Sequence, residues 1–434
     1  MKSSFFALLL LTFLTYGCTS HTTSNISYIN GQWFDGNAFS KKTLYSKNGY
    51  FTDREPSRID STIDLSGKFI IPPFGDAHTH ELADTNSLQK MLPRFIEDGI
   101  FYVQVLTNHA SKVTEFRKEF SQPGSIDVIY ANGGFTATLG HPFVAFETSA
   151  LGLHWSAMFT QRDKIRGSRL AENDAYWFLD SPEEVQEKWD SIMTTNPDIL
   201  KIYLIRTSEY DELFNSGNMG NFGLSTETAR AIVNKAKDNN LRVVAHVETA
   251  YDIRVGLDIG VDGFGHLPGY SWDGLADSET YRLTVEDLQK AAEANVYVTP
   301  TVNFARVYAT TYDENGMPNI NTDRLKTVNL FLSTELQRLH EAGVIIAIGS
   351  DQQNETSLAE LHYMHDELNV FDNATLLRLA TYTTPKAIFP DRKIGKFEND
   401  YEASFLALNG NPLKDWSTLN NISMRVKNGY IIEP

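Results

Sequence analysis

The sequence predicts an α/β protein built on a TIM (β/α)8 barrel, with a small β-sandwich formed by both chain ends. Apolar, strand-like runs alternate with helical patterns through the centre of the chain, which is typical of a parallel sheet. Ligand-type side chains close several of these runs, and short strands with turns fill both ends. With 434 residues, of which 41% are hydrophobic, the chain is long enough for one barrel and an accessory domain.

The predicted barrel strands share a short, apolar and often β-branched composition. They cover residues 69–71, 100–106, 126–131, 199–205, 241–247, 263–267, 296–301 and 344–350. Helical patterns fill the gaps at 86–97, 182–193, 225–238, 284–294, 323–342, 358–368 and 373–387. The longest irregular insert, 135–181, follows the third strand and is rich in aromatic residues. A long loop at the catalytic end of a barrel favours a lid or a substrate wall.

Short strands and turns occupy both chain ends, at 26–68 and 391–434. Asn-Gly and Asp-Gly pairs between apolar residues are hairpin signals. Because each end has too few strands to be stable alone, we expect the two ends to combine into one β-sandwich. The barrel then covers residues 69–390. Two separate surface ribbons are the alternative.

Residues 1–25 are expected to form a signal peptide and a tether. Lys2 precedes an apolar run at 5–14 that is too short for a comfortable membrane span, and Gly17-Cys18 follows. Cys18 is the only cysteine, so it forms no internal disulfide, and its place favours lipidation. The segment resembles a bacterial lipoprotein leader, which implies a lipid-anchored protein on the periplasmic or cell-surface side of the cell envelope. Ordinary signal cleavage near Cys18 is the alternative.

The charge of the chain narrows the choice of partners. A net charge of -17 and a pI near 5.1 oppose binding to nucleic acid and broad adhesion to anionic lipid, because phosphates are repelled. Contact with a membrane is therefore expected only through a lipid on Cys18. A small molecule is the expected binding partner.

Six ligand-type side chains lie at or near the ends of predicted strands. They are His78, His80, Lys201, His246, His266 and Asp351. His78 and His80 are two residues apart on an extended segment, so both project to the same face. Since a parallel barrel gathers its strand ends into one ring, these side chains are expected to converge on a metal site. Asp76 either orients a ligand histidine or caps the strand end.

Over nearly all of the predicted mature chain, the sequence resembles the metal-dependent amidohydrolase superfamily, in its dipeptidase- and imidazolonepropionase-like branch. The resemblance is carried by Gly-Lys-Phe-Ile-Ile-Pro-Pro-Phe-Gly-Asp-Ala-His-Thr-His at 67–80, by the lysine and two single histidines, by Gly349-Ser350-Asp351 and by 380–387. It implies that two divalent ions are bound. His78, His80 and Asp351 would hold one ion, His246 and His266 the other, and a carboxylated Lys201 would bridge them.

The resemblance also implies a mechanism, in which a hydroxide shared by the two ions attacks a carbonyl and Asp351 passes the proton to the leaving group. Histidine-rich ligands without thiolates favour zinc, with manganese, cobalt or iron as alternatives. A single ion with an unmodified Lys201 is the structural alternative. His141 and Tyr203 resemble residues that contact substrate in this superfamily. Arg206 and Arg306 follow strands and either bind a substrate carboxylate or pair with surface acids.

The sequence thus predicts a metal-dependent hydrolase that cleaves an amide-type carbon–nitrogen bond of a small molecule or a dipeptide. A lactone or ester hydrolase on the same metal site is one alternative, because a metal pair activates water against many carbonyls. A metal-bearing binding protein without turnover is the other.

Overall fold

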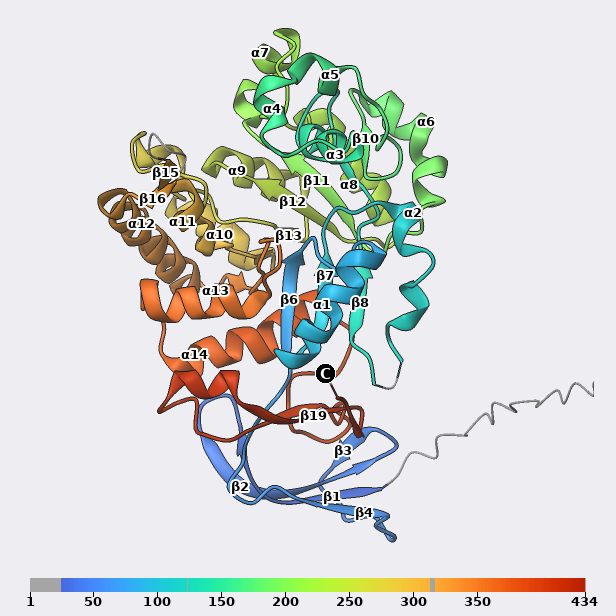
Figure 1. Cartoon of the computed structure of the whole chain (residues 1–434), viewed down its shortest axis with the longest axis vertical. Helices are drawn as coiled ribbons and strands as arrows, with labels where there is room; N and C mark the ends of the chain where they lie inside the picture. The colour runs from blue at the N-terminus through green and yellow to red at the C-terminus, as the bar shows by residue number, and fades with distance from the viewer. Residues whose placement is uncertain (1–24, 123, 313–316, 434) are drawn as a thin grey trace, which may run out of the picture.

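The computed structural model describes residues 25–122, 124–312 and 317–433 (Figure 1). Among these residues, no helix has the length and apolar content needed to cross a bilayer. Cys18 and the expected leader lie outside the described ranges, so the lipid anchor stays a prediction.

Membrane fractionation of wild-type protein and a Cys18→Ala variant tests the lipid anchor. We expect wild-type protein in the membrane fraction, and wild-type protein found only in the soluble fraction would contradict the prediction.

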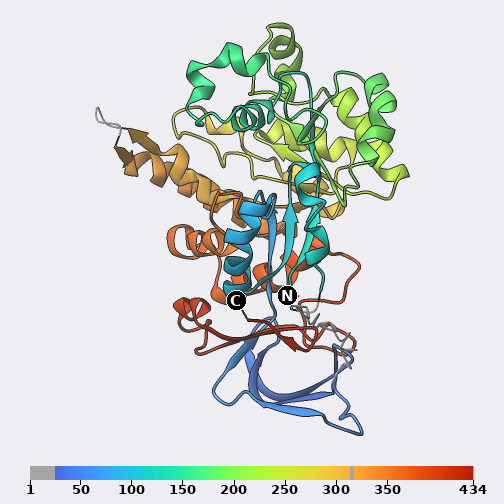
Figure 2. The same ribbon diagram turned by 45° about the vertical axis from the view of Figure 1, so that its right-hand side comes forward.

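Both chain ends build one sheet, as predicted. Its strands are β1 (Ile26–Phe34), β2 (Phe39–Lys47), β3 (Tyr50–Thr52), β4 (Ser61–Asp64), β5 (Phe69–Ile71), β18 (Phe405–Leu408), β19 (Ile422–Lys427) and β20 (Tyr430–Ile431). The order is β20-β19-β18-β5-β1-β2-β3, with β4 on β1, and the C-terminal strands face the N-terminal ones in Figures 1 and 2. Tyr28, Trp33, Phe51 and Phe405 pack edge to face between them.

The predicted first barrel strand is wrong. Phe69–Ile71 is β5, which pairs with β1 and β18 in the terminal sheet. Pro72 and Pro73 end this strand, because proline has no backbone N–H to donate to a neighbouring strand. The barrel begins after them with β6 (Phe74–Thr79), which is buried along its whole length.

The predicted TIM barrel is confirmed. After β6, its strands are β7 (Ile100–Val105), β8 (Asp127–Tyr130), β11 (Leu200–Leu204), β12 (Val243–Val247), β13 (Gly263–Phe264), β14 (Tyr297–Val298) and β17 (Ile345–Ile346). The pairs β6–β7, β7–β8, β11–β12, β12–β13, β13–β14 and β14–β17 are parallel, and β11 also pairs in parallel with β9 (Gly134–Thr136). Helices that follow or precede these strands include α1 (Thr85–Glu97), α6 (Pro182–Met193), α8 (Thr226–Asp238), α9 (Ala250–Ile259), α10 (Val285–Glu293), α12 (Thr322–Glu341), α13 (Ser357–Tyr363), α14 (Asn373–Arg378) and α15 (Thr384–Ile388).

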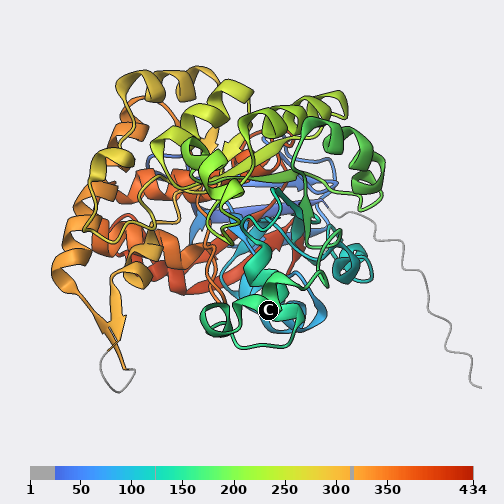
Figure 3. The same cartoon turned by 90° about the horizontal axis from the view of Figure 1, so that it is seen from above.

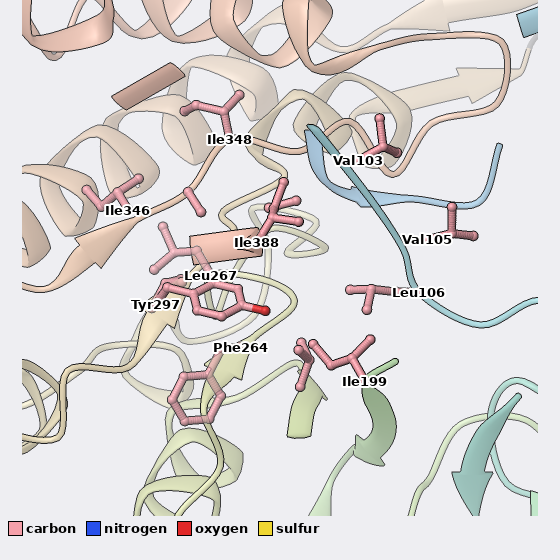
Figure 4. Packing of buried hydrophobic residues seen from close by; sticks show 14 of the residues in the cluster. Val103, Val105, Leu106, Ile199, Phe264, Leu267, Tyr297, Ile346, Ile348 and Ile388 are labelled. Carbon is pink, nitrogen blue, oxygen red and sulfur yellow. The ribbon is translucent and has the colours of Figure 1, made fainter. Parts of the chain in front are cut away.

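Apolar side chains on and beside several barrel strands pack together in one buried cluster. Figure 4 shows Val103, Leu106, Ile199, Phe264 and Ile348 gathered in one cluster, and all five are fully buried. Burial of each such side chain contributes about 1.5–3 kcal/mol. The strands that carry the ligand-type residues are therefore held by a buried apolar core.

The insert 135–181 contains helices and strands, although its hydrophobic residues follow no regular period in the sequence. It contains β9 (Gly134–Thr136), α3 (Phe143–Ala150), α4 (Ala157–Thr160), α5 (Arg162–Arg166) and β10 (Tyr176–Phe178). The buried carboxylate of Glu147 accepts hydrogen bonds from Ala171 N at 2.8 Å, Leu170 N at 3.0 Å and Tyr176 Oη at 2.7 Å. Figure 3, seen from above, shows this segment lying over the barrel. A hairpin of β15 (Thr310–Tyr312) and β16 (Pro318–Ile320) projects from another side (Figure 2).

The carboxylate of Asp76 joins the first and last barrel strands. It accepts the backbone N–H of His78 at 3.2 Å, the backbone N–H of Ser350 at 3.2 Å and the Ser350 hydroxyl at 3.1 Å. Ala77 N also donates to Ile348 O at 2.8 Å across the same seam. These contacts are with two backbone N–H groups and the Ser350 hydroxyl, and not with a histidine ring. Of the two roles considered for Asp76, they fit the one at the strand end. Burial raises the pKa of Asp76 to about 7.

We expect Asp76→Ala to destabilise the protein, because it leaves buried N–H groups of His78 and Ser350 without an acceptor. The free energy of unfolding should fall by about 3 kcal/mol, measured by denaturant unfolding above pH 7, where the carboxylate is ionised. Asp211→Ala, at an exposed position on the helix α7 (Tyr210–Asn215), is the control. Equal midpoints for both variants would show that the seam does not depend on Asp76.

Candidate metal centre

The ligand-type side chains predicted from the sequence come together at the C-terminal ends of the barrel strands. His78 lies in β6, Lys201 in β11 and His246 in β12, while His266 follows β13 and Asp351 follows β17. His78, Lys201, His246 and His266 are buried. The His80 side chain is 42% exposed, which leaves one side of the cluster open to substrate.

Asp351 lies at the centre of the cluster. Its Oδ1 is 3.0 Å from His80 Nε2 and 3.5 Å from His78 Nε2, and its Oδ2 is 3.7 Å from His266 Nε2. His246 Nδ1 lies 3.0 Å from His266 Nε2. Ligand atoms of His78, His80 and Asp351 all lie within 4.8 Å of one another, a spacing that can hold one cation.

A strained backbone places the Asp351 carboxylate. Asp351 has a φ of 49°, which is uncommon for a residue with a side chain. Its backbone N–H donates to His78 O at 2.7 Å, so the turn is fixed against the first barrel strand. Strain of this kind collects at functional sites and is held by the surrounding structure.

Each histidine presents one ring nitrogen to the cluster and one away from it. His80 Nδ1 lies 3.1 Å from Thr107 O, and His266 Nδ1 lies 2.7 Å from Thr301 Oγ1. These outer contacts orient the rings and favour a proton on the outer nitrogen. His78 Nδ1 and His246 Nε2 are buried without a hydrogen-bond partner among the described residues.

Burial keeps the deeper histidines neutral, because it lowers the pKa of His78, His246 and His266 well below the usual value. Neighbouring histidines and Lys201 add to this effect by electrostatic repulsion. A neutral imidazole is the form that binds a metal ion.

Lys201 is 1% exposed, and its Nζ has no hydrogen-bond partner among the described residues. Burial lowers the pKa of Lys201 to about 7, and only partial compensation comes from Asp351. Gly265 makes room for it: a Cβ there would lie 2.4 Å from Lys201 Nζ and 3.0 Å from His78 Cε1. A buried amine held near neutrality and without a partner is unusual for a purely structural lysine.

These donors fit divalent metal ions. Four imidazoles and a carboxylate converge, and the buried polar atoms left without partners, such as Lys201 Nζ, lie among them. A set of nitrogen and oxygen ligands without thiolates suits zinc, manganese, cobalt or iron.

His141 and Tyr203 also lie at this site. The His141 ring centroid is 5.1 Å from those of Tyr203 and His246, and the Tyr203 ring is 5.3 Å from that of His246. Tyr203 Oη lies 2.7 Å from Thr107 Oγ1, within hydrogen-bond reach. Burial, reinforced by His246, lowers the pKa of His141 to about 3, so its ring is neutral at ordinary pH.

The two arginines considered for substrate binding are paired with acids. Arg206 Nε donates to Glu209 Oε1 at 3.0 Å, and a second Arg206 nitrogen contacts the same carboxylate. Arg306 pairs with Glu367 and lies over the Tyr363 ring at 5.4 Å. Their role in substrate binding stays a prediction.

Two neighbours of the site were not recognised in the sequence. The Tyr270 ring stacks on His266, with centroids 3.9 Å apart and planes 9° from parallel. Glu248 Oε1 lies 3.9 Å from His246 Nε2. The spacing of two residues between His246 and Glu248 was a usable signal, because such side chains leave the same face of a strand. Tyr270 lies in a loop, where no periodicity points to the site.

The barrel and its histidine–carboxylate cluster are those of a TIM-barrel hydrolase. The chain belongs to the amidohydrolase family, whose model matches residues 208–432, more than half of the chain. The protein is therefore a hydrolase that acts on carbon–nitrogen bonds. The matched segment includes His246, His266 and Asp351 but begins after Lys201. No curated protein matches the chain in sequence.

Solved structures share the fold across almost the whole chain. A Xaa-Pro dipeptidase with bound methionine is 19% identical, with a TM-score of 0.68 over 95% of this chain and 100% of that one. A prolidase complexed with N-methylphosphonate-L-proline is 18% identical, with a TM-score of 0.68 over 94% and 100%. The ochratoxinase of A. niger is 16% identical, with a TM-score of 0.70 over 95% and 96%. At these identities the likeness establishes the fold.

Proposed function

We propose that the protein is a binuclear metal-dependent hydrolase that cleaves the amide bond of a dipeptide or a similar small amide. The observation that carries the proposal is the convergence of His78, His80 and Asp351 with the buried His246–His266 pair and a partnerless Lys201 Nζ. His78, His80 and Asp351 would hold one ion, and His246 and His266 the other. Zinc is the proposed metal, with manganese, cobalt and iron as alternatives.

When bound, such ions lower the pKa of water and polarise a carbonyl. Asp351 is placed to act as the base, because its carboxylate reaches three histidines of the cluster at 3.0–3.7 Å. It takes a proton from the attacking water, whose oxygen bonds to the carbonyl carbon. As the carbon–nitrogen bond breaks, Asp351 gives that proton to the leaving nitrogen, so the product amine departs neutral.

Neutral polar groups beside the cluster orient the substrate. His141 lies over Tyr203 and His246, and its low pKa leaves an uncharged N–H to donate to the carbonyl oxygen. The Tyr203 hydroxyl, already near Thr107, is a second donor on the same side. Donors aimed at an oxygen that gains negative charge lower the reaction barrier.

We further propose that Lys201 is carboxylated and bridges the two ions. A protonated lysine repels cations, whereas a carbamate offers two oxygens. Its pKa of about 7 leaves a substantial fraction of the amine neutral near physiological pH, which is the form that adds to carbon dioxide. Gly265 has no side chain that would occupy the space beside Lys201 Nζ, where the added carboxyl group would lie.

Carboxylation of Lys201 should accelerate as the pH rises through about 7, because the lowered pKa means that protonated amine is converted to neutral amine across that range. With dissolved carbon dioxide held constant, the rate should rise roughly tenfold per pH unit below this value and level off above it. The measurement starts from protein that has been stripped of metal. 13C-labelled carbon dioxide and metal ions are then added, and the carbamate carbon is followed by 13C NMR. Lys201→Met is the control and should show no carbamate carbon. A signal of equal strength in that variant would refute the assignment.

The proposed substrate class has two supports. The amide-cleaving family is one, and the other is that a Xaa-Pro dipeptidase and a prolidase are among the similar folds. A lactone or ester hydrolase on the same groups is the second candidate, because Asp351 and His141 act on any carbonyl placed there.

We expect Asp351→Asn to lose about 10²- to 10⁴-fold in kcat on dipeptides and N-acyl amino acids, because the amide cannot carry a proton to the leaving nitrogen. Rates on a panel of dipeptides, N-acyl amino acids and lactones, with metal content measured in parallel, test this. Asp323→Asn, at an exposed position on α12, is the matched control. Faster turnover of lactones would favour the ester hydrolase. Metal-loaded wild type and Asp351→Asn that are equally inactive on the whole panel would favour a binding protein.

A further inference from the structure

Two ring nitrogens of the histidine cluster, His78 Nδ1 and His246 Nε2, have no hydrogen-bond partner among the described residues, and the second lies near a carboxylate. His80 and His266 each place the outer nitrogen against an oxygen, at 3.1 Å from Thr107 O and 2.7 Å from Thr301 Oγ1. His246 turns Nδ1 toward the cluster, 3.0 Å from His266 Nε2, and its Nε2 is buried without a hydrogen-bond partner among the described residues. Glu248 Oε1 lies 3.9 Å from that Nε2.

A histidine that binds a metal through Nδ1 must carry its proton on Nε2. Leaving that buried N–H without an acceptor is unfavourable, because the group has lost its hydrogen bond to water. Glu248 leaves β12 two residues after His246, and a movement of about 1 Å brings its carboxylate to hydrogen-bond distance. Its backbone N–H donates to Asp252 Oδ2 at 3.3 Å, and its side chain is 33% exposed.

Other groups near His246 are less suited to accept this proton. Tyr203 packs its ring 5.3 Å from the His246 ring, and its hydroxyl is engaged with Thr107. His141 packs its ring at 5.1 Å and Tyr270 at 6.3 Å. Arg206 is the cation near Glu248, but its guanidinium group is paired with Glu209 and makes no ion pair with Glu248 among the described contacts. Glu248 is thus the carboxylate placed to serve His246.

We propose that Glu248 is a positioning residue: it accepts the Nε2 proton of His246, and thereby fixes the tautomer and ring orientation with which His246 binds one of the two metal ions. The proposal rests on the metal centre put forward as the proposed function. A carboxylate behind a ligand histidine raises the basicity of the ring and holds its direction, and loss of such a partner typically weakens metal binding by about 10- to 100-fold.

The test is the metal affinity of the full chain, measured by competition with a chromophoric chelator, for wild type, Glu248→Ala and Glu248→Gln. Glu248→Ala should weaken one of the two bound ions by about 10- to 100-fold and leave the other unchanged. Glu248→Gln keeps an acceptor oxygen and the side-chain shape, so it should restore part of the loss. Glu212→Ala, which removes an exposed carboxylate on the helix Tyr210–Asn215, is the matched control and should bind as wild type.

Cobalt substitution gives a second readout that does not depend on turnover. The visible absorption of one of the two cobalt ions should change in Glu248→Ala and not in Glu212→Ala, because only the former disturbs a ligand. Wild-type affinity for both ions in Glu248→Ala, or in Glu248→Leu, which also removes the acceptor, if the alanine variant does not fold, would overturn the proposal. So would unchanged affinity combined with a raised KM for cationic substrates, which would make Glu248 a substrate-binding group. A wild-type chain that binds no metal would instead refute the proposed function.

Discussion

The closure of the barrel between its first and last strands is the constraint on which the site depends. Ala77 N donates to Ile348 O, and Asp351 N donates to His78 O, so residues from opposite ends of the barrel sequence are held at hydrogen-bond distance. The buried Asp76 carboxylate adds three further contacts to the seam. Because the backbone is fixed there, Asp351 meets His78 and His80 without any adjustment of long side chains. The metal centre is therefore a consequence of how the sheet closes.

The low polarity of the interior gives these side chains their chemistry. Burial lowers the pKa of Lys201 to about 7 and keeps His78, His246 and His266 neutral, so each offers a lone pair where a charged form would repel a cation. A protein that kept these polar groups solely for stability would leave few of them unpaired. Nitrogens of Lys201, His78 and His246 have no hydrogen-bond partner among the described residues, a pattern typical of functional sites, where stability is lower.

Much of this arrangement followed from sequence patterns alone. The helix at 182–193 was placed to the residue, because Ser181 caps it, proline opens it and its apolar positions repeat with a helical period. The residues of the cluster were predicted because most of them end an apolar run, whereas Lys201 lies inside one. The strand at 69–71 was misplaced because an apolar run does not say which sheet it joins, and the double proline after it was the overlooked signal. The insert 135–181 was predicted as an irregular loop, and its short helices were missed because they are stabilised by contacts such as those of Glu147, which no local sequence pattern records.

The account stands or falls on two cations sharing one cluster. Electron paramagnetic resonance of the manganese-loaded protein measures this directly, because two manganese ions about 3.5–4 Å apart couple magnetically. We predict the spectrum of a coupled pair, which disappears when His266 is replaced by alanine. A spectrum of isolated manganese in fully active wild-type protein, or full activity after exhaustive removal of metal, would contradict the account.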